Sequence, residues 1–182
     1  MMLLENTLVT VIALSTPLII AVIGETISEK GGVINLSAEG TIMFCALFGF
    51  VGAYETDVAV MGFLSAMLLG AGISLFISFC DINLRMDQIA VGFVLTILCA
   101  NLSNFLGQDY VRINGPLITK LPIPFLSEIP FIGAVLFNHS FITYFSLILI
   151  PMSWLFLNKT SLGLNIRASG ENPTSASSRG IN

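Results

Sequence analysis

The chain has 182 residues and a formal net charge of −4, with 55% hydrophobic and only 10% charged residues. Soluble domains carry about 25% charged residues, so this composition cannot supply the polar surface that a soluble globule needs. The mean hydropathy of +0.92 excludes the same class. The few Lys and Arg residues form no cluster of the kind that binds nucleic acid. We therefore expect an all-α, polytopic bundle of transmembrane helices.

The N-terminal segment resembles a signal peptide only at first sight. Residues 1–6 contain no Lys or Arg, so the positively charged start of a signal peptide is missing. The apolar run at 7–24 is longer than the apolar part of most signal peptides and close to the roughly 20 residues that a membrane helix needs. We interpret this run as the first membrane span.

About five apolar stretches predict membrane-spanning helices. All are free of charged residues except the second, which contains Glu39, and the neutral but polar Asn35, near its beginning. For that stretch the sequence leaves two interpretations open. Residues 33–40 either belong to the span or form a loop or half-buried turn that leads into a shorter helix from Thr41. The predicted spans are residues 7–24, 33–54, 58–80, 89–106 and 141–157.

Small residues recur every four positions along the third and fourth predicted spans. Such a stripe allows another helix to approach closely, so it predicts packing within a bundle in preference to a pore lining. The members of the two stripes are Ala66, Gly70, Ser74 and Ser78, and Gly92, Thr96, Ala100 and Asn104.

The basic residues predict the orientation of the chain. With the C-terminus in the cytoplasm, most Lys and Arg residues fall on the cytoplasmic side, as the positive-inside rule requires. An odd number of spans then places the N-terminus outside. The basic residues expected inside are Lys30, Arg85, Lys159, Arg167 and Arg179, and those expected outside are Arg112 and Lys120.

The long outer connection at 107–140 contains several prolines, which preclude one continuous helix and indicate a structured external loop. Within it, residues 129–136 are apolar but too short to span, so they predict a surface-lying or partly inserted helix. The prolines are Pro116, Pro122, Pro124 and Pro130.

Polar residues in apolar runs are the candidates for a structural or a pathway role. Asn35 and Glu39 lie near the inner end of the second span, where capping or pairing at the interface is the favoured interpretation of Glu39 and direct transport is the alternative. Asn101 and Asn104 lie in the outer half of the fourth span, where packing is favoured over a polar path.

Motifs of catalysis are missing from the sequence. It contains no GxxxxGK[ST], GxSxG or HExxH pattern and no paired carboxylates, so we expect no catalytic residue, bound cofactor or metal site. Cys45, Cys80 and Cys99 lie in or at the end of apolar runs and form no CxxC pair, so we interpret them as packing residues.

The chain becomes polar after residue 157, which predicts a transmembrane domain at 1–157 and a cytoplasmic segment at 158–182. Pro173 suits the first turn of a helix with Asn172 as its cap. Gly180 suits the end of that helix. The sequence thus predicts a short helix of about two turns, with a disordered tail as the alternative.

Three ordered regions resemble permease subunits of bacterial ABC importers, in the branch that handles simple sugars, nucleosides and branched-chain amino acids. The tail contains T-x-x-G-L-x-I-R-A-x-G-E-N-P-x-x-A-x-x-x-G-I-N at 160–182. The run I-S-E-K-G-G-V-I-N-L-S-A-E-G at 27–40 and the segment D-I-N-L-R-M-D-Q-I-A-V-G at 81–92 match two further family regions. The loop sequence I-P-F-I-G at 129–133 is similar to nucleoside-type members. Ser175-Ala176 stands where the family often has Ala-Ala.

This resemblance implies a permease that forms a translocation path for a nucleoside or simple sugar in the plasma membrane. It implies a second permease subunit, a separate ATPase at the cytoplasmic face and an extracellular substrate-binding protein. Residues 173–180 match the family's coupling helix, which docks into the ATPase. The family continues with more membrane helices, so the chain resembles the N-terminal portion of a permease. The residues that match the coupling region are Arg167, Gly170, Glu171, Asn172, Pro173 and Gly180.

Two other classes of function stay open from the residues alone. An ion-coupled secondary transporter predicts intramembrane acids and repeated halves with broken helices, of which only Glu39 offers a trace. A membrane-embedded enzyme predicts a catalytic constellation facing a cavity, and the sequence offers none.

Overall fold

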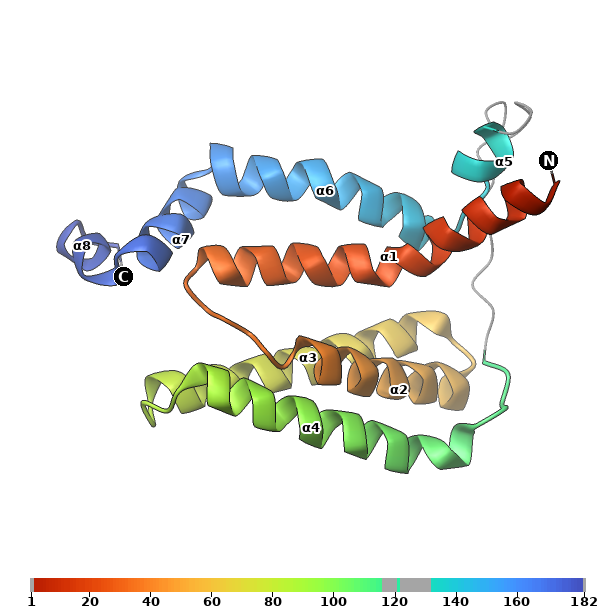
Figure 1. Ribbon diagram of the computed structural model, residues 1–182, viewed down its shortest axis with the longest axis horizontal. Coiled ribbons are helices and arrows are strands. Elements are labelled where there is room, and N and C mark those ends of the chain that lie inside the picture. Colours follow the sequence, from red (N-terminus) through yellow and green to blue (C-terminus); the bar gives the residue numbers. More distant parts are fainter. Residues whose placement is uncertain (1, 116–120, 122–131, 182) are drawn as a thin grey trace. The chain divides into compact units, whose positions relative to one another are not determined.

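The computed structural model describes residues 2–115, 121 and 132–181, which form mostly helices (Figure 1). The predicted all-α class is confirmed. The chain divides into two compact units. Unit 1 combines Met1–Gly32 with Ile118–Asn182, and unit 2 is Val33–Leu117. The second unit is therefore inserted in the sequence of the first.

Two long helices form the body of unit 1. They are α1 (Met2–Lys30) and α6 (Phe141–Lys159), and they pack against each other. Thr16 Oγ1 donates a hydrogen bond of 3.1 Å to Thr143 Oγ1 between them. Both threonines are buried, so each polar group is satisfied where water is excluded. This bond joins α1 to α6 across most of the sequence.

The short helix α5 (Ile132–Leu136) is fixed to α6 through His139. The His139 ring is buried, and its Nε2 lies 2.7 Å from the Val135 carbonyl oxygen. The His139 backbone N–H donates to the Tyr144 hydroxyl at 3.0 Å. The helix α5 occupies the end of the predicted surface helix at 129–136. Residues 129–131 and the four prolines of the predicted external loop lie outside the described residues.

Among its described residues 33–115, unit 2 contains three α-helices and one short 3-10 helix, η1 (Gln108–Tyr110). Helix α2 (Ala38–Thr56) packs on both α3 (Ala59–Ile82) and α4 (Gln88–Gly107). Side-chain hydroxyls bind carbonyl oxygens across these helices. Ser65 Oγ of α3 donates to Phe48 O at 2.9 Å, and Ser103 Oγ of α4 donates to Met43 O at 3.0 Å. Hydroxyl groups thus join α2 to both of its neighbours.

The predicted small-residue stripes face α2 at several positions. A Cβ placed on Gly49 of α2 would lie 3.3 Å from Ala66 Cβ, and one on Gly70 would lie 3.5 Å from Cys45 Sγ. A Cβ on Gly92 of α4 would lie 3.1 Å from the Leu36 backbone nitrogen. The prediction of close helix packing is confirmed for Ala66 and Gly70, whereas Gly92 packs on the turn that precedes α2.

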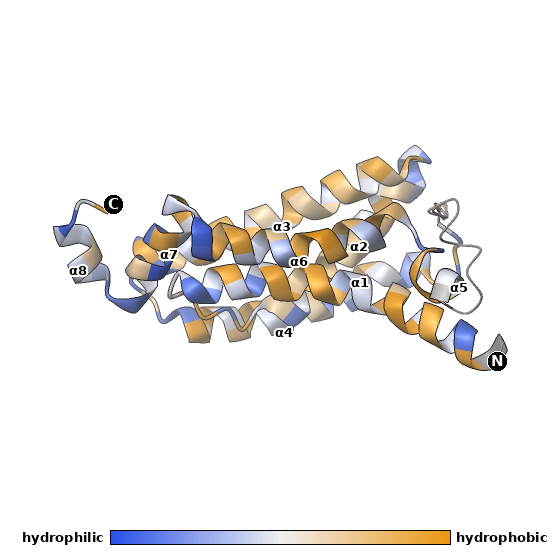
Figure 2. Cartoon of the chain, turned by 90° about the horizontal axis from the view of Figure 1, so that it is seen from above, coloured by the Kyte–Doolittle hydropathy of each residue, from blue (hydrophilic) through white to orange (hydrophobic). Residues whose placement is uncertain are grey.

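Four helices are long and apolar enough to cross a membrane, among the residues that the structure describes. They are the predicted first, third, fourth and fifth spans, and Figure 2 shows hydrophobic residues along them. The four are Leu4–Lys30, Ala59–Ile82, Gln88–Tyr110 and Phe141–Lys159.

The second predicted span needs a correction at its beginning. Residues 33–37 are not helical, and α2 starts at Ala38. The structure therefore agrees with the second interpretation, in which a turn leads into a shorter helix. The helix begins at Ala38, three positions before the expected Thr41. Its 19 residues reach about 28 Å, close to the roughly 30 Å of a bilayer core. A fifth crossing by α2, and the orientation of the chain, stay predictions.

Candidate coupling site

The predicted coupling residues lie in the C-terminal helices α7 (Ser161–Glu171) and α8 (Pro173–Ser178) or directly beside the ends of α8. The helix predicted at the tail is present, with Pro173 in its first turn and Asn172 as its cap. Asn172 Oδ1 accepts hydrogen bonds from the Ser175 backbone N–H at 3.0 Å and from Thr174 Oγ1 at 2.7 Å. The cap orients α8 because it satisfies a donor that the first turn leaves free.

Gly180 ends the tail helix with a left-handed backbone, at φ +80°. An L side chain rarely adopts this conformation, which explains the glycine at this position. The backbone N–H of Ile181 then donates to Ala176 O at 3.1 Å, and Ala176 itself is buried. The end of the helix is thereby closed as predicted.

Removing the cap should loosen α8. We expect Asn172→Ala to destabilise this helix by about 1 kcal/mol, because the first turn loses its acceptor. Hydrogen–deuterium exchange of the amides at 175–178 should then be faster by roughly five-fold. The matched control is Ser177→Ala, which removes an exposed hydroxyl from the same helix and should leave exchange unchanged. Equal exchange rates in the two variants would contradict this role of Asn172.

A tight turn connects α6 to α7 and depends on Gly163. A Cβ at this glycine would overlap the Phe156 carbonyl oxygen and the Leu157 backbone. Thr160 caps α7, since its hydroxyl oxygen accepts from the Gly163 N–H at 3.0 Å. The same hydroxyl donates to Phe156 O at 2.6 Å. The turn therefore fixes the direction in which α7 leaves the membrane helix.

The C-terminal end of α7 is held by a contact with the end of α1. A Cβ on Gly170 would overlap Lys30 O and would lie only 2.8 Å from the Gly32 backbone nitrogen. Gly32 has φ +87°, so the chain turns sharply at this contact. At Gly170 itself, backbone therefore packs on backbone.

Arg167, Gly170 and Glu171 line one cavity of about 320 Å³ in unit 1. The ends of α1 and α6 complete its wall. Arg167 Nε is buried and has no hydrogen-bond partner among residues 2–115, 121 and 132–181. Buried donors without a partner are rare in native structures, because each costs about 1–3 kcal/mol. The full lining is Glu29, Lys30, Leu157, Asn158, Arg167, Gly170 and Glu171.

The other polar candidates lie in unit 2 and do not gather into one site. Asn35 Oδ1 accepts from the Ser37 backbone N–H at 2.9 Å and from Ser37 Oγ at 2.6 Å, so it shapes the turn before α2. Glu39 is exposed in the first turn of α2, where a carboxylate interacts favourably with the helix dipole. Both positions suit a structural role.

Asn101 and Asn104 lie further along α4 and are exposed. Asn101 Nδ2 donates to Ile97 O of its own helix at 2.8 Å. Thr96 of the same helix donates a hydrogen bond to Leu36 O, in the turn before α2. Asn104 lies about 12 Å further along the helix axis. The structure thus separates the asparagines from Asn35 and Glu39.

Sequence reasoning missed several residues that build the candidate coupling site. Lys30, Gly31 and Gly32 contact the C-terminal turn of α7, and Thr160 and Gly163 fix its beginning. The Thr-x-x-Gly spacing is a usable signal, because a threonine cap binds the N–H three residues later. The contact of Gly32 with Gly170 has no local signal, since it forms between distant parts of the sequence.

Comparison with known proteins assigns a family to this arrangement. Residues 7–182 match the family described as the permease component of the branched-chain amino acid transport system. A nucleoside ABC transporter permease of Lactococcus lactis is 34% identical over 180 residues, 92% of this chain and 56% of the relative. A guanosine ABC transporter permease of Bacillus subtilis is 33% identical over 183 residues, 92% of this chain and 56% of the relative.

A third relative has a different named solute. It is a putative glucose ABC transporter permease of Haloferax volcanii, 33% identical over 171 residues, 92% of this chain and 52% of the relative. The chain thus spans about half the length of these curated relatives. No solved structure matches the chain. The family match covers nearly all residues, and the chain belongs to the permease component family of the branched-chain amino acid transport system.

Proposed function

We propose that the chain acts as a permease component of an ATP-driven importer, with α8 as the helix that docks on a separate ATPase. The observation that carries this proposal is the backbone contact of Gly170 with Lys30 and Gly32. A displacement of α8 passes to α7 and then to the end of α1, because backbone meets backbone at Gly170. The family membership and the capped, mostly exposed α8 support the same role.

The proposed assembly contains a second permease subunit, an extracellular substrate-binding protein and the ATPase that hydrolyses ATP. The tail at 158–182 then lies in the cytoplasm and the N-terminus outside, as the distribution of basic residues favours. Nucleosides are the favoured solute class, because two of the named relatives are nucleoside or guanosine permeases. A simple sugar is the second candidate, supported by the glucose-type relative.

Co-purification tests the docking role of α8. The chain is co-expressed with candidate P-loop ATPases, and the ATPase recovered with the permease is quantified. We expect Ser177→Tyr to lower recovery at least ten-fold, because it adds a ring to an exposed position of α8. Ser161→Tyr is the matched control, since the same change lies at an exposed position in the first turn of α7.

Two results decide the proposal. Equal recovery of the ATPase with Ser177→Tyr and with the unchanged chain would contradict docking through α8. Uptake of radiolabelled guanosine, compared with ribose in the same cells, separates the two solute classes.

A further inference from the structure

Three amide side chains form a stripe near the C-terminal end of α4. Asn101, Asn104 and Gln108 follow one another at spacings of three and four residues, which places them on one face of a helix. All three are exposed, and residues 88–108 contain no charged side chain. We call these three residues the amide stripe. It is a neutral polar strip on a helix that is long and apolar enough to cross a membrane.

The amide stripe lies on the face of α4 that points away from α2. On the opposite face, Ser103 Oγ donates to Met43 O of α2, and Cys99 is only 3% exposed. Both residues are two positions from Asn101, so each lies about 160° around the helix from it. Within the described residues 33–115, unit 2 therefore leaves the stripe uncovered.

Lipid is a poor neighbour for these amides. When α4 crosses the membrane, Asn101 lies about 9 Å along the axis from Gly107, the last residue of the helix, and Asn104 about 5 Å. Asn101 Nδ2 donates to Ile97 O at 2.8 Å, whereas the Asn104 amide makes no hydrogen bond among residues 2–115, 121 and 132–181. An amide without a partner in an apolar medium costs at least about 2 kcal/mol. Water or another polar group must therefore reach this face.

A second helix packed on the stripe is the first alternative. Helices in membranes approach each other closely where small residues line the contact. The small residues Gly92, Thr96 and Gly107 of α4 lie against α2 or the turn before it. The side chains beside the stripe are large, with Ile97 49% exposed and Phe105 70% exposed. A water-filled path therefore fits this face better than a packed helix does.

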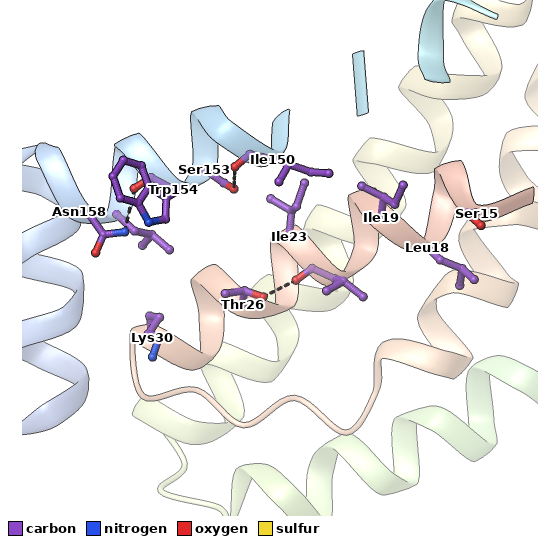
Figure 3. A pocket seen from close by; sticks show the side chains of 12 residues that line it. Ser15, Leu18, Ile19, Ile23, Thr26, Lys30, Ile150, Ser153, Trp154 and Asn158 are labelled. Carbon is purple, nitrogen blue, oxygen red and sulfur yellow. Dashed lines mark hydrogen bonds between the residues drawn. The ribbon is translucent and has the colours of Figure 1, made fainter. Parts of the chain in front are cut away.

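A groove of about 640 Å³ between α1 and α6 of unit 1 is the second alternative for a solute path (Figure 3). Its lining is mostly apolar. Figure 3 shows that Thr26, Ser153 and Asn158 donate to carbonyl oxygens of their own helices, at 2.7, 2.8 and 2.9 Å. Ser15 donates to Val11 O in the same way, at 2.7 Å. Along its apolar length the groove thus offers a polar solute fewer partners than the amide stripe does.

We propose that Asn101 and Asn104 line the solute path and bind a neutral solute with several hydrogen-bonding groups, with a nucleoside favoured. The inference rests on the proposed function as a permease and adds the residues that touch the solute. An asparagine amide carries both N–H donors and a carbonyl acceptor, which match the edge of a base and the hydroxyls of a sugar. The exposed Phe105 ring beside them gives a flat base an apolar surface for stacking.

Cysteine labelling tests whether water reaches the stripe. Asn101→Cys and Asn104→Cys are made in the full chain, in the cells that naturally produce it, and membrane fragments are treated with a charged thiol reagent that does not enter lipid. Both positions are exposed, so the replacements should not disturb packing within unit 2. The control is Leu68→Cys, at an apolar position of α3 that is 74% exposed. Because a thiol forms its reactive thiolate in contact with water, both variants should react roughly ten-fold faster than this control. Labelling of the unchanged chain gives the background from Cys45, Cys80 and Cys99.

Protection by solute tests the contact itself. By mass action, guanosine at about four times its half-saturating concentration should slow labelling of Asn101→Cys and Asn104→Cys by roughly five-fold. Protection by ribose alone would support the same residues and assign a sugar to them. Labelling of both variants at the rate of Leu68→Cys would overturn the water-filled path, and fast labelling that neither solute slows would overturn the solute contact. Neither measurement involves the ATPase, so a failure of α8 docking and a failure of this inference are distinguishable.

Discussion

Gly170→Ala should lower the melting midpoint of unit 1 by roughly 15 °C in detergent. The added methyl group would overlap Lys30 O and would lie 2.8 Å from the Gly32 nitrogen. These are backbone atoms, which cannot rotate away, so we expect the upper end of the overpacking range, about 3 kcal/mol. Trp154 is the single tryptophan of the chain and lies in α6 of unit 1. Its fluorescence during heating therefore reports this transition.

Gly24→Ala is the matched control for this experiment. It makes the same change in α1, where a new Cβ has no atom within 4 Å. Alanine forms helices better than glycine by up to about 1 kcal/mol, so the control should melt at the same or a higher temperature. A Gly170→Ala midpoint equal to that of the control would refute the close contact between α7 and α1.

Gly40→Ala should destabilise unit 2 by a similar amount, again about 3 kcal/mol. A Cβ on Gly40 would overlap the Thr96 carbonyl oxygen and would lie 2.7 Å from the Thr96 Cα. This contact holds the beginning of α2 against α4. The buried thiols of Cys80 and Cys99 lie in α3 and α4 of this unit. A thiol-reactive dye should thus label Gly40→Ala at a lower temperature than the unchanged chain.

Gly72→Ala serves as the control in unit 2, because nothing lies within 4 Å of a Cβ built there. Dye labelling of this variant should begin at the temperature of the unchanged chain or above it. If Gly72→Ala were also labelled at a lower temperature than the unchanged chain, the loss of a glycine, and not the contact of Gly40 with Thr96, would explain the effect.

The helix at the tail was predictable because its signals are local. Asn172, Pro173 and Gly180 are a cap, a first-turn residue and a helix end within one short segment, and each acts on its own neighbours. The long spans were predictable for a similar reason, since uninterrupted apolar length is a property of one segment. The helical class and most spans therefore followed from the sequence.

The beginning of α2 was not predictable, because competing interactions decide it. Asn35 and Glu39 fit a capped helix end and a polar position within a span equally well. In the structure, Asn35 binds Ser37, and Thr96 of α4 binds Leu36 O. The second of these bonds joins distant parts of the sequence, so it requires tertiary structure.

The backbone contacts of the glycines were the most important feature that the sequence did not predict. The sequence drew attention to Gly170 only through a family resemblance, and the partners Lys30 and Gly32 lie at the other end of unit 1's sequence. A glycine that accommodates a distant backbone looks the same in sequence as one in open space, such as Gly72.

The insertion of unit 2 within unit 1 has a consequence for biogenesis. The bond between Thr16 and Thr143 joins residues 127 positions apart, so α1 leaves the ribosome long before its partner α6. At a synthesis rate of about 5–20 residues per second, α1 waits roughly 6–25 s in the membrane. Unit 2 is continuous in sequence and can assemble during that time. Ribosome-bound chains that end before α6 should therefore contain a packed unit 2 and an α1 whose Thr16 hydroxyl still lacks Thr143.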